Sequence, residues 1–312
     1  MLYSGFCSAD NIFNIHDNLN SQSLNEYFQI YEDESGQLSI EDISHPSFNR
    51  EFITLNSIKD NLGFSNSVFW LKFTLKNNSN SEYWLLKNNY NSIQQLDLYE
   101  QQNNSTFKIF ESGFLKPISV RDYESNRMIL PLNIRKNNIN TYYLRIKTLT
   151  PVIINFDIKS KNNVTKSEAF QNVFTGVFLG MMLILVLVDL LFYFILRIKG
   201  QLYLAIYTFC MLIVFSLYDG ILLPYIPISL TQYATTFVIT NGCIAVLSLY
   251  LYYEQLLINE KNKYKTITRL IIFPYWISII ILIFSTDSYI PFQMYVTGFL
   301  IMPIIGLFYS GY

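Results

Sequence analysis

The sequence predicts two domains of different classes, a β-sandwich followed by an α-helical membrane domain. Two observations divide the 312-residue chain in this way. In the N-terminal half, apolar residues alternate with polar ones, which is typical of half-buried antiparallel strands. In the C-terminal half, long apolar runs are separated only by short polar loops, which is typical of membrane-spanning helices. A water-facing domain joined to a membrane domain favours reception, transport or anchoring over soluble catalysis.

Alternation with a period of two is clearest in residues 69–75, 128–134 and 142–147. Further strands are predicted between Asn- and Ser-rich turns, at about 83–88, 93–99, 106–110 and 152–158. No helical period competes with this pattern before residue 165. Many short strands at this spacing predict a β-sandwich, to which we assign residues 25–160.

The sandwich is preceded by an N-terminal segment, residues 1–24. Its first ten residues are too short to hold both the charged and the apolar region of a signal peptide, but they fit the end of one. Of the three cysteines, only Cys7 lies in the polar half, because Cys210 and Cys243 lie in apolar runs. No internal disulfide framework is therefore expected.

After a linker at 161–171, the membrane domain at 172–312 contains five apolar runs, each long enough to span a bilayer. The runs are at about 172–196, 202–222, 231–253, 267–285 and 289–310. Lysine and arginine occur in the loops after the first and third runs and are absent from those after the second and fourth. The positive-inside rule therefore places the N-terminal domain outside the cytoplasm.

Several segments resemble a known family. They read SGQLSIEDI, NLGFSNSVFWLKFTLKN, YWLLKNNYNSIQQLDLYE, NRMILPLNI and TYYLRIKT, followed by FTGVFLGMMLILVLVDLLFYFILRIKGQLYLAIYTFCMLIVFSLYDG. The first five resemble the extracellular sensor domain of the seven-transmembrane receptors with diverse intracellular signalling modules. The last resembles the first two helices of that family's membrane domain. The resemblance covers residues 25–310.

This resemblance implies a multi-pass receptor of the bacterial inner membrane with a periplasmic, jelly-roll-like sandwich similar to carbohydrate-binding modules. Family members pass a signal through seven helices to a cytoplasmic kinase, cyclase or phosphatase module. The chain departs from the family in having five apolar runs and no output module, and in having Asp189 where Asn is usual. We therefore expect a receptor for a carbohydrate-like extracytoplasmic ligand whose output module is absent from these residues.

Candidate ligand-binding residues lie on strand faces that the alternation predicts to face water. They are Trp70, Lys72, Arg127, Tyr143 and Arg145. Aromatic rings beside cationic donors can stack on a sugar and bind its hydroxyls or carboxylates. The resemblance supports Lys72 and Arg145, which match basic positions in the family's strands. The alternative interpretation is a solvated face or a contact between domains.

Two carboxylates in the membrane domain are candidates for transmembrane signalling. Asp189 is the only charge deep within the first run, where a carboxylate is costly and usually faces a partner or a wet cavity. It fits either a relay or a structural residue in place of Asn. Asp219 precedes Gly220 near the outer end of the second run and fits either a contact from the sensor or a helix terminator.

Other partner and function classes have less support. The two histidines, His16 and His45, lack metal-ligand spacing, and no catalytic motif occurs, so we expect no enzyme, no metal and no cofactor. A net charge of −1 without a basic block argues against nucleic acid. The expected partners are a small ligand, the lipid bilayer and a second copy of the chain, since two-state receptors often form symmetric pairs.

Two alternatives to the receptor stay open. One is a membrane-anchored periplasmic binding module without signalling. The other is a proton-coupled transporter, because apolar helices with a buried carboxylate also suit a carrier. Against a transporter, Asp189 is the single deep charge and the runs show no inverted repeat.

Overall fold

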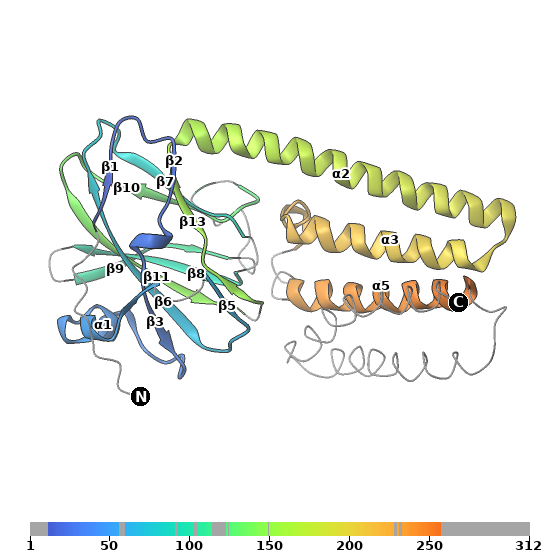
Figure 1. Cartoon of the computed structure of the whole chain (residues 1–312), viewed down its shortest axis with the longest axis horizontal. Helices are drawn as coiled ribbons and strands as arrows, with labels where there is room; N and C mark the ends of the chain where they lie inside the picture. Colours follow the sequence, from blue (N-terminus) through green and yellow to red (C-terminus); the bar gives the residue numbers. More distant parts are fainter. Residues whose placement is uncertain are drawn as a thin grey trace. The chain divides into compact units, whose positions relative to one another are not determined.

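The computed structural model describes residues 12–55, 60–90, 93–102, 105–113, 123, 125–148, 150–227, 230 and 233–256. They divide into two compact units (Figure 1). The β-rich unit includes everything described before Gln171, and the helical unit includes most of the described residues from Gln171 onward. The predicted runs at 267–285 and 289–310 lie outside the described residues.

The larger sheet of the β-rich unit has the strand order β4-β3-β6-β11-β8-β9, and β1 pairs in parallel with β6. Its strands are β1 (Ile12–Ile15), β3 (Gln29–Asp33), β4 (Ile53–Thr54), β6 (Val68–Asn77), β8 (Gln95–Gln102), β9 (Ser105–Ser112) and β11 (Ile139–Lys147). The long strands β6 and β11 pair at its centre, where the alternation in the sequence is strongest.

The smaller sheet has the order β10-β7-β13-β2. Its strands are β2 (Ser21–Ser23), β7 (Tyr83–Asn88), β10 (Ile129–Asn133) and β13 (Phe156–Lys159), and a separate pair is formed by β5 (Asn61–Gly63) and β12 (Val152–Ile153). All pairs in the smaller sheet are antiparallel. The strands predicted around 69–75, 83–88, 93–99, 106–110, 128–134 and 142–147 are confirmed within a few residues at their ends.

The core lies between the two sheets, and one ring joins them. Phe28 makes edge-to-face contacts with Phe73 of β6, at 5.1 Å between ring centroids, and with Phe156 of β13, at 5.8 Å. The inward faces of both sheets also carry buried leucines, such as Leu71 and Leu86, and further buried rings, such as Tyr142, which stacks on Phe73, and Trp84. The predicted β-sandwich is confirmed in this sense, while its jelly-roll connectivity stays a prediction.

Short helices lie within the β-rich unit, where the sequence shows no helical period. Helix α1 (Ile40–Ser44) and the 3₁₀ helices η1 (Asn25–Tyr27) and η2 (Pro46–Arg50) are too short to show a helical period. The signal for α1 is its capping box. The Ser39 side chain accepts from the Asp42 N–H, and Asp42 Oδ2 accepts from the Ser39 N–H at 3.0 Å.

Residues 12–24, which the prediction leaves outside the sandwich, contribute strands to both of its sheets. Strand β1 pairs with β6 and strand β2 pairs with β13, and the side chains of Phe13 and Ile15 are buried. Strands of three or four residues are too short for alternation to identify them. The first ten residues, for which the end of a signal peptide is predicted, lie outside the described part.

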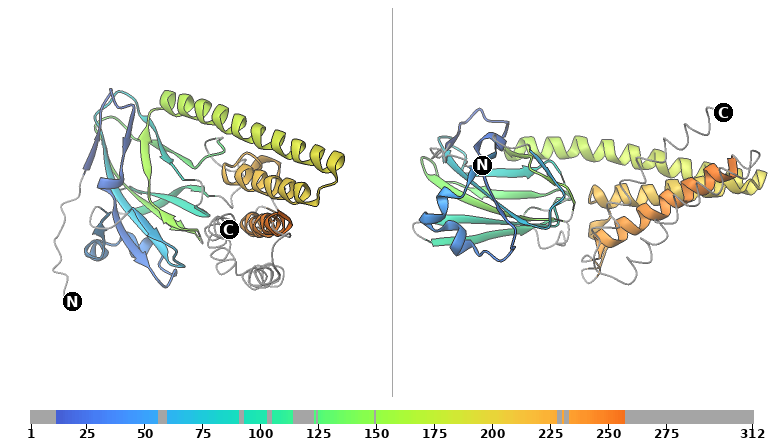
Figure 2. Two further views of the ribbon diagram at one scale, coloured as in Figure 1. Left: turned by 45° about the vertical axis from the view of Figure 1, so that its right-hand side comes forward. Right: turned by 60° about the horizontal axis from the view of Figure 1, so that its bottom comes forward.

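The helical unit contains three described helices long and apolar enough to cross a membrane. They belong to α2 (Lys161–Leu196), α3 (Lys199–Tyr218) and α5 (Ala234–Leu256), and a 3₁₀ helix, η5 (Leu223–Tyr225), follows α3. Figures 1 and 2 show α3 and α5 side by side, where Cys210 and Met211 pack with Ala245. The predicted runs 172–196, 202–222 and 231–253 are confirmed as helices.

Helix α2 begins earlier than predicted, so the expected linker at 161–171 is helical. Its first turns, with the sequence KNNVTKSEAF, are polar and carry no apolar run, which is why hydropathy does not find them. Helix α2 also exposes most of its apolar side chains within the described part of the chain. Gly176 and Gly180 face open space among the described residues, because a Cβ built on either would contact nothing within 4 Å beyond the helix itself.

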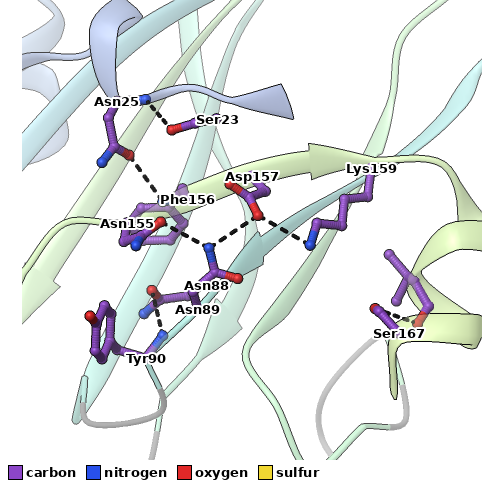
Figure 3. Close-up of polar contacts among 11 residues, drawn as sticks. Ser23, Asn25, Asn88, Asn89, Tyr90, Asn155, Phe156, Asp157, Lys159 and Ser167 are labelled. Carbon is purple, nitrogen blue, oxygen red and sulfur yellow. Dashed lines mark hydrogen bonds and ion pairs between the residues drawn. The ribbon is translucent and has the colours of Figure 1, made fainter. Parts of the chain in front are cut away.

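The outer face of the smaller sheet carries a charged cluster that includes a buried lysine. Figure 3 shows part of it, in which the Asp157 carboxylate accepts from Asn89 Nδ2 at 3.1 Å and pairs with Lys159 Nζ at 3.1 Å. Lys87 lies opposite Asp157 in the ladder and is 1% exposed. Burial, and then the charges of Lys159 and Arg127, lower the pKa of Lys87 to about 8.

We expect Phe28→Ala to destabilise the β-rich unit by about 3–5 kcal/mol, because it removes the ring that contacts both sheets. Urea unfolding of the full chain in lipid nanodiscs, followed by tryptophan fluorescence, measures this loss. The matched control is Phe107→Ala, which removes an exposed phenylalanine and should cost less than about 0.5 kcal/mol. Equal losses in the two variants would contradict the assignment of Phe28 to the core.

We expect the stability of the β-rich unit to gain a contribution from Lys87 as the pH rises from about 8 towards 10.5. In this window the unfolded chain binds a proton that folded Lys87 has lost, and stability rises with pH wherever the unfolded state binds more protons. Lys87→Met should remove this contribution and stabilise the unit at pH 7. Unfolding midpoints of the parent chain and of this variant across the window measure it, and Lys136→Met, at an exposed turn, is the control.

Candidate functional site

The outer face of the larger sheet carries aromatic and charged side chains in two adjacent rows. In an antiparallel ladder, directly opposed residues share a face. The first row crosses β3, β6, β11 and β8 as Tyr31, Trp70, Arg145 and Asp97. The second crosses β6, β11 and β8 as Lys72, Tyr143 and Tyr99. Four of the five predicted ligand-binding residues therefore lie together on this face.

Part of this face is covered, which corrects the prediction that Trp70, Lys72 and Tyr143 face water. These side chains are 1%, 6% and 1% exposed. Residues 40–52, which connect β3 to β4, pack over them through an apolar cluster that includes Ile43 and Phe52. Alternation within a strand shows which side chains share a face but not whether another segment covers that face. We call residues 40–52 the cover segment.

The cover segment also makes a polar contact with the face. Asn49 Oδ1, in η2, accepts a hydrogen bond from Lys72 Nζ at 3.3 Å. Phe48 of the segment packs edge to face against Tyr31 of β3, at 4.8 Å between ring centroids, and Phe52 packs tilted against Tyr31 and Tyr143. The cover segment is thus held by ring contacts and a side-chain hydrogen bond rather than by a strand ladder.

One polar atom under the cover segment has no partner within the described residues. Trp70 Nε1 is buried and donates to no acceptor there. The other described tryptophan differs, because Trp84 Nε1 donates to the Ser81 carbonyl at 3.0 Å. A buried donor without a partner costs about 1–3 kcal/mol. The Trp70 indole N–H can therefore donate a hydrogen bond to an acceptor that reaches it.

The other end of the face is partly open and carries an ion-pair network. Lys108 Nζ, on β9, pairs with Asp97 Oδ1 at 3.3 Å and with Glu111 Oε1 at 2.5 Å. Arg145 Nη1 lies 3.9 Å from Asp97 Oδ2. Lys108 Nζ also lies 5.9 Å from the centre of the Tyr99 ring. This end therefore presents cationic donors and carboxylate acceptors within reach of one another, beside the Tyr99 ring, which is 9% exposed.

Tyr99 keeps its proton at neutral pH. Burial, reinforced by the negative charge of Asp97, raises the pKa of its hydroxyl above the ordinary value. Asp97, Tyr99 and Lys108 were not among the predicted site residues. The predicted strand at 93–99 already placed Asp97 and Tyr99 on one side of that strand, but only the pairing of β8 with β11 brings them beside Arg145.

Arg127 is not part of this face. It precedes β10 of the smaller sheet, and its charge acts on Lys87 of β7. It therefore lies apart from the other four candidate residues, because parity along separate strands does not show which sheet each strand enters.

The two predicted signalling carboxylates lie at different places in the helical unit. Asp189 is half-buried in α2. Asp219 is the C-cap of α3, where its N–H donates to the Phe215 carbonyl at 2.9 Å and Gly220 follows at φ +80°. A positive φ after a helix is a common terminator, so the turn interpretation of Asp219-Gly220 is confirmed. The signalling role of each carboxylate stays a prediction.

Comparisons with known proteins agree with these two units. The model described as 7TMR-DISM extracellular 2 matches residues 25–160. The model described as 7TM diverse intracellular signalling matches residues 171–312. A search of curated proteins finds no match. The two matched regions cover most of the β-rich unit and the apolar helices. The chain belongs to the family of seven-transmembrane receptors with diverse intracellular signalling modules, and it is a membrane protein with an extracellular sensor domain.

Proposed function

We propose that the chain senses a small extracytoplasmic ligand on the outer face of the larger sheet and passes the signal through its helices to a cytoplasmic output module. The observation that carries the proposal is the row of Trp70, Arg145 and Asp97, in which a donor, a cation and a carboxylate stand side by side. Binding and transmission require no catalytic step, so the proposal includes no enzyme activity, metal or cofactor.

The chemistry of the face favours a carbohydrate-like ligand. Sugar hydroxyls both donate and accept hydrogen bonds, and the open end offers Arg145 and Lys108 as donors beside Asp97 as an acceptor. The Tyr99 ring is 9% exposed and packs against Trp70, so a sugar ring can stack on it only when the cover segment moves. A sugar carboxylate would find the two cations.

Full engagement of the face requires a movement of the cover segment. Trp70 and Tyr143 become accessible only when Ile43 and Phe52 shift away from them. The Trp70 indole would then exchange an unpaired state for a hydrogen bond to the ligand. Ligand binding and displacement of the cover segment are thereby linked, which is the property that a sensor needs.

The proposal includes the location and assembly of the protein. We propose that the sandwich lies in the periplasm and that the helices cross the inner membrane of a bacterium. Loops with Lys and Arg follow the first and third apolar runs, which supports a sandwich outside the cytoplasm. Two copies of the chain form a symmetric pair. A membrane-anchored binding module is the alternative if a ligand binds without any change in the helices.

We expect Arg145→Met to weaken ligand binding by at least about tenfold, because it removes a charge-assisted donor from the open end of the face. Trp70→Phe, which keeps a ring and removes the indole N–H, should weaken binding by about fivefold. Calorimetric titration of the full chain in nanodiscs with neutral oligosaccharides and oligouronides measures both effects.

The matched control for this experiment is Lys136→Met, which removes an exposed cation from a turn outside the face. Its affinity should equal that of the parent chain. Binding that is unchanged in both Arg145→Met and Trp70→Phe would move the ligand site off this face. Absence of binding to every sugar in the panel would overturn the ligand class.

A further inference from the structure

Helix α2 starts within the β-rich unit and continues into the helical unit. Residues 161–170 belong to the first unit, and the same uninterrupted helix runs on from Gln171 to Leu196. It contains no proline, so every residue in it has the backbone N–H that an intrahelical hydrogen bond needs. At 1.5 Å per residue it is about 54 Å long.

The first turns of α2 pack on the outer face of the smaller sheet. Val164 is fully buried, in a cluster with Leu85 of β7 and Ile129 of β10, and Tyr83 and Tyr123 pack against that cluster. Leu85 occupies the face of β7 that also carries Lys87, opposite the interior of the sandwich. An apolar contact therefore holds the start of the helix to the outside of the sheet.

Polar contacts flank this apolar one. Asn163 Nδ2 donates to Asn20 Oδ1 and to Ser160 Oγ, both at 2.9 Å. One turn after Val164, the Glu168 carboxylate accepts a hydrogen bond from Ser125 Oγ. The charge of Glu168 also acts on Lys87 of the sheet. Residues 161–170 are thus fixed to the sheet on both sides of Val164.

The face of α2 that contacts the sheet is the same face that contacts the other helices. Eighteen residues make five turns of an α-helix, so Met182 lies directly in line with Val164. Met182 packs on the cluster of Cys210 and Met211 in α3. Phe178, one turn before Met182 on the same face, contacts the Phe215 ring of α3 edge to face at 5.4 Å.

We propose that Val164 and Glu168 are positioning residues that couple the smaller sheet to the first membrane helix. A displacement of the sheet moves the start of α2, and the helix carries that displacement to the contacts of Phe178 and Met182 with α3. The inference rests on the proposed receptor function and specifies where the signal leaves the sensor domain. It assigns the output to the smaller sheet, whereas the ligand face belongs to the larger one.

The native thiol of Cys210 makes the coupling measurable. Cys210 is 5% exposed and lies in the cluster against which Met182 packs. Its rate of reaction with N-ethylmaleimide therefore depends on how tightly Met182 covers it. Hydrogen exchange of residues 161–170 reports separately on whether the start of the helix is held to the sheet.

The test compares Val164→Asp with Thr165→Asp in the full chain, in nanodiscs of phosphatidylethanolamine and phosphatidylglycerol. Both variants add a carboxylate at neighbouring positions of one helix turn, but Thr165 is exposed. Val164→Asp should raise the exchange of residues 161–170 by at least about tenfold, because a charge enters an apolar contact. It should also change the labelling rate of Cys210 by at least about threefold, while Thr165→Asp changes neither.

Two outcomes would overturn the inference. If exchange rises in Val164→Asp while the Cys210 rate equals that of Thr165→Asp, the contact exists but does not couple. If exchange does not rise, Val164 does not hold the helix. Val164→Thr, which keeps the shape and buries a hydroxyl, should give smaller changes in the same direction, and it decides the matter if Val164→Asp does not reach the membrane. Neither measurement uses a ligand, so failure of the sugar titration leaves this result intact.

Discussion

Burial of the central strand β6 on both of its faces is the constraint on which the sensor domain depends. Its inward residues, such as Phe73, form the core with the smaller sheet, while Trp70 and Lys72 on the other face lie under the cover segment. A sheet with one solvated face would leave the row of aromatic and charged residues in water. Here the sandwich needs a third layer, and the layer is made from the short connection between β3 and β4.

This third layer explains why the ligand face combines charge with burial. Lysine and tryptophan are rarely fully buried without partners, because desolvation of a charge or a donor is costly. At the covered end, Lys72 finds Asn49 of the cover segment, whereas the Trp70 indole finds no described acceptor. At the open end, Asp97 gathers the cations of Lys108 and Arg145. The polar groups of the face therefore have hydrogen-bond or ion-pair partners at the open end, and the Trp70 N–H lacks such a partner among the described residues at the covered end.

How much could be predicted from the sequence depends on the length of each element. Strands such as β6 and β11 are long enough for alternation to identify both their position and their inward side, and three apolar runs are long enough to identify helices. Strand β1, helix α1 and the polar start of α2 are too short or too polar for either signal. Part of the candidate site could be predicted, because alternation along one strand places Trp70 and Lys72 on the same face of it. Their partners across the sheet, and the exclusion of Arg127, depend on non-local pairing that no local pattern contains.

The in-line arrangement of Val164 and Met182 on α2 restricts how the length of this protein can vary. One residue inserted between them would turn the two contacts about 100° apart, whereas a seven-residue insertion would leave them within about 20° of alignment. Surface loops elsewhere in the chain have no helical period to preserve, and they tolerate insertions far better. Homologous receptors with this coupling should therefore differ in length within α2 by numbers of residues close to whole turns, such as about 7, 11 or 18, or else not at all.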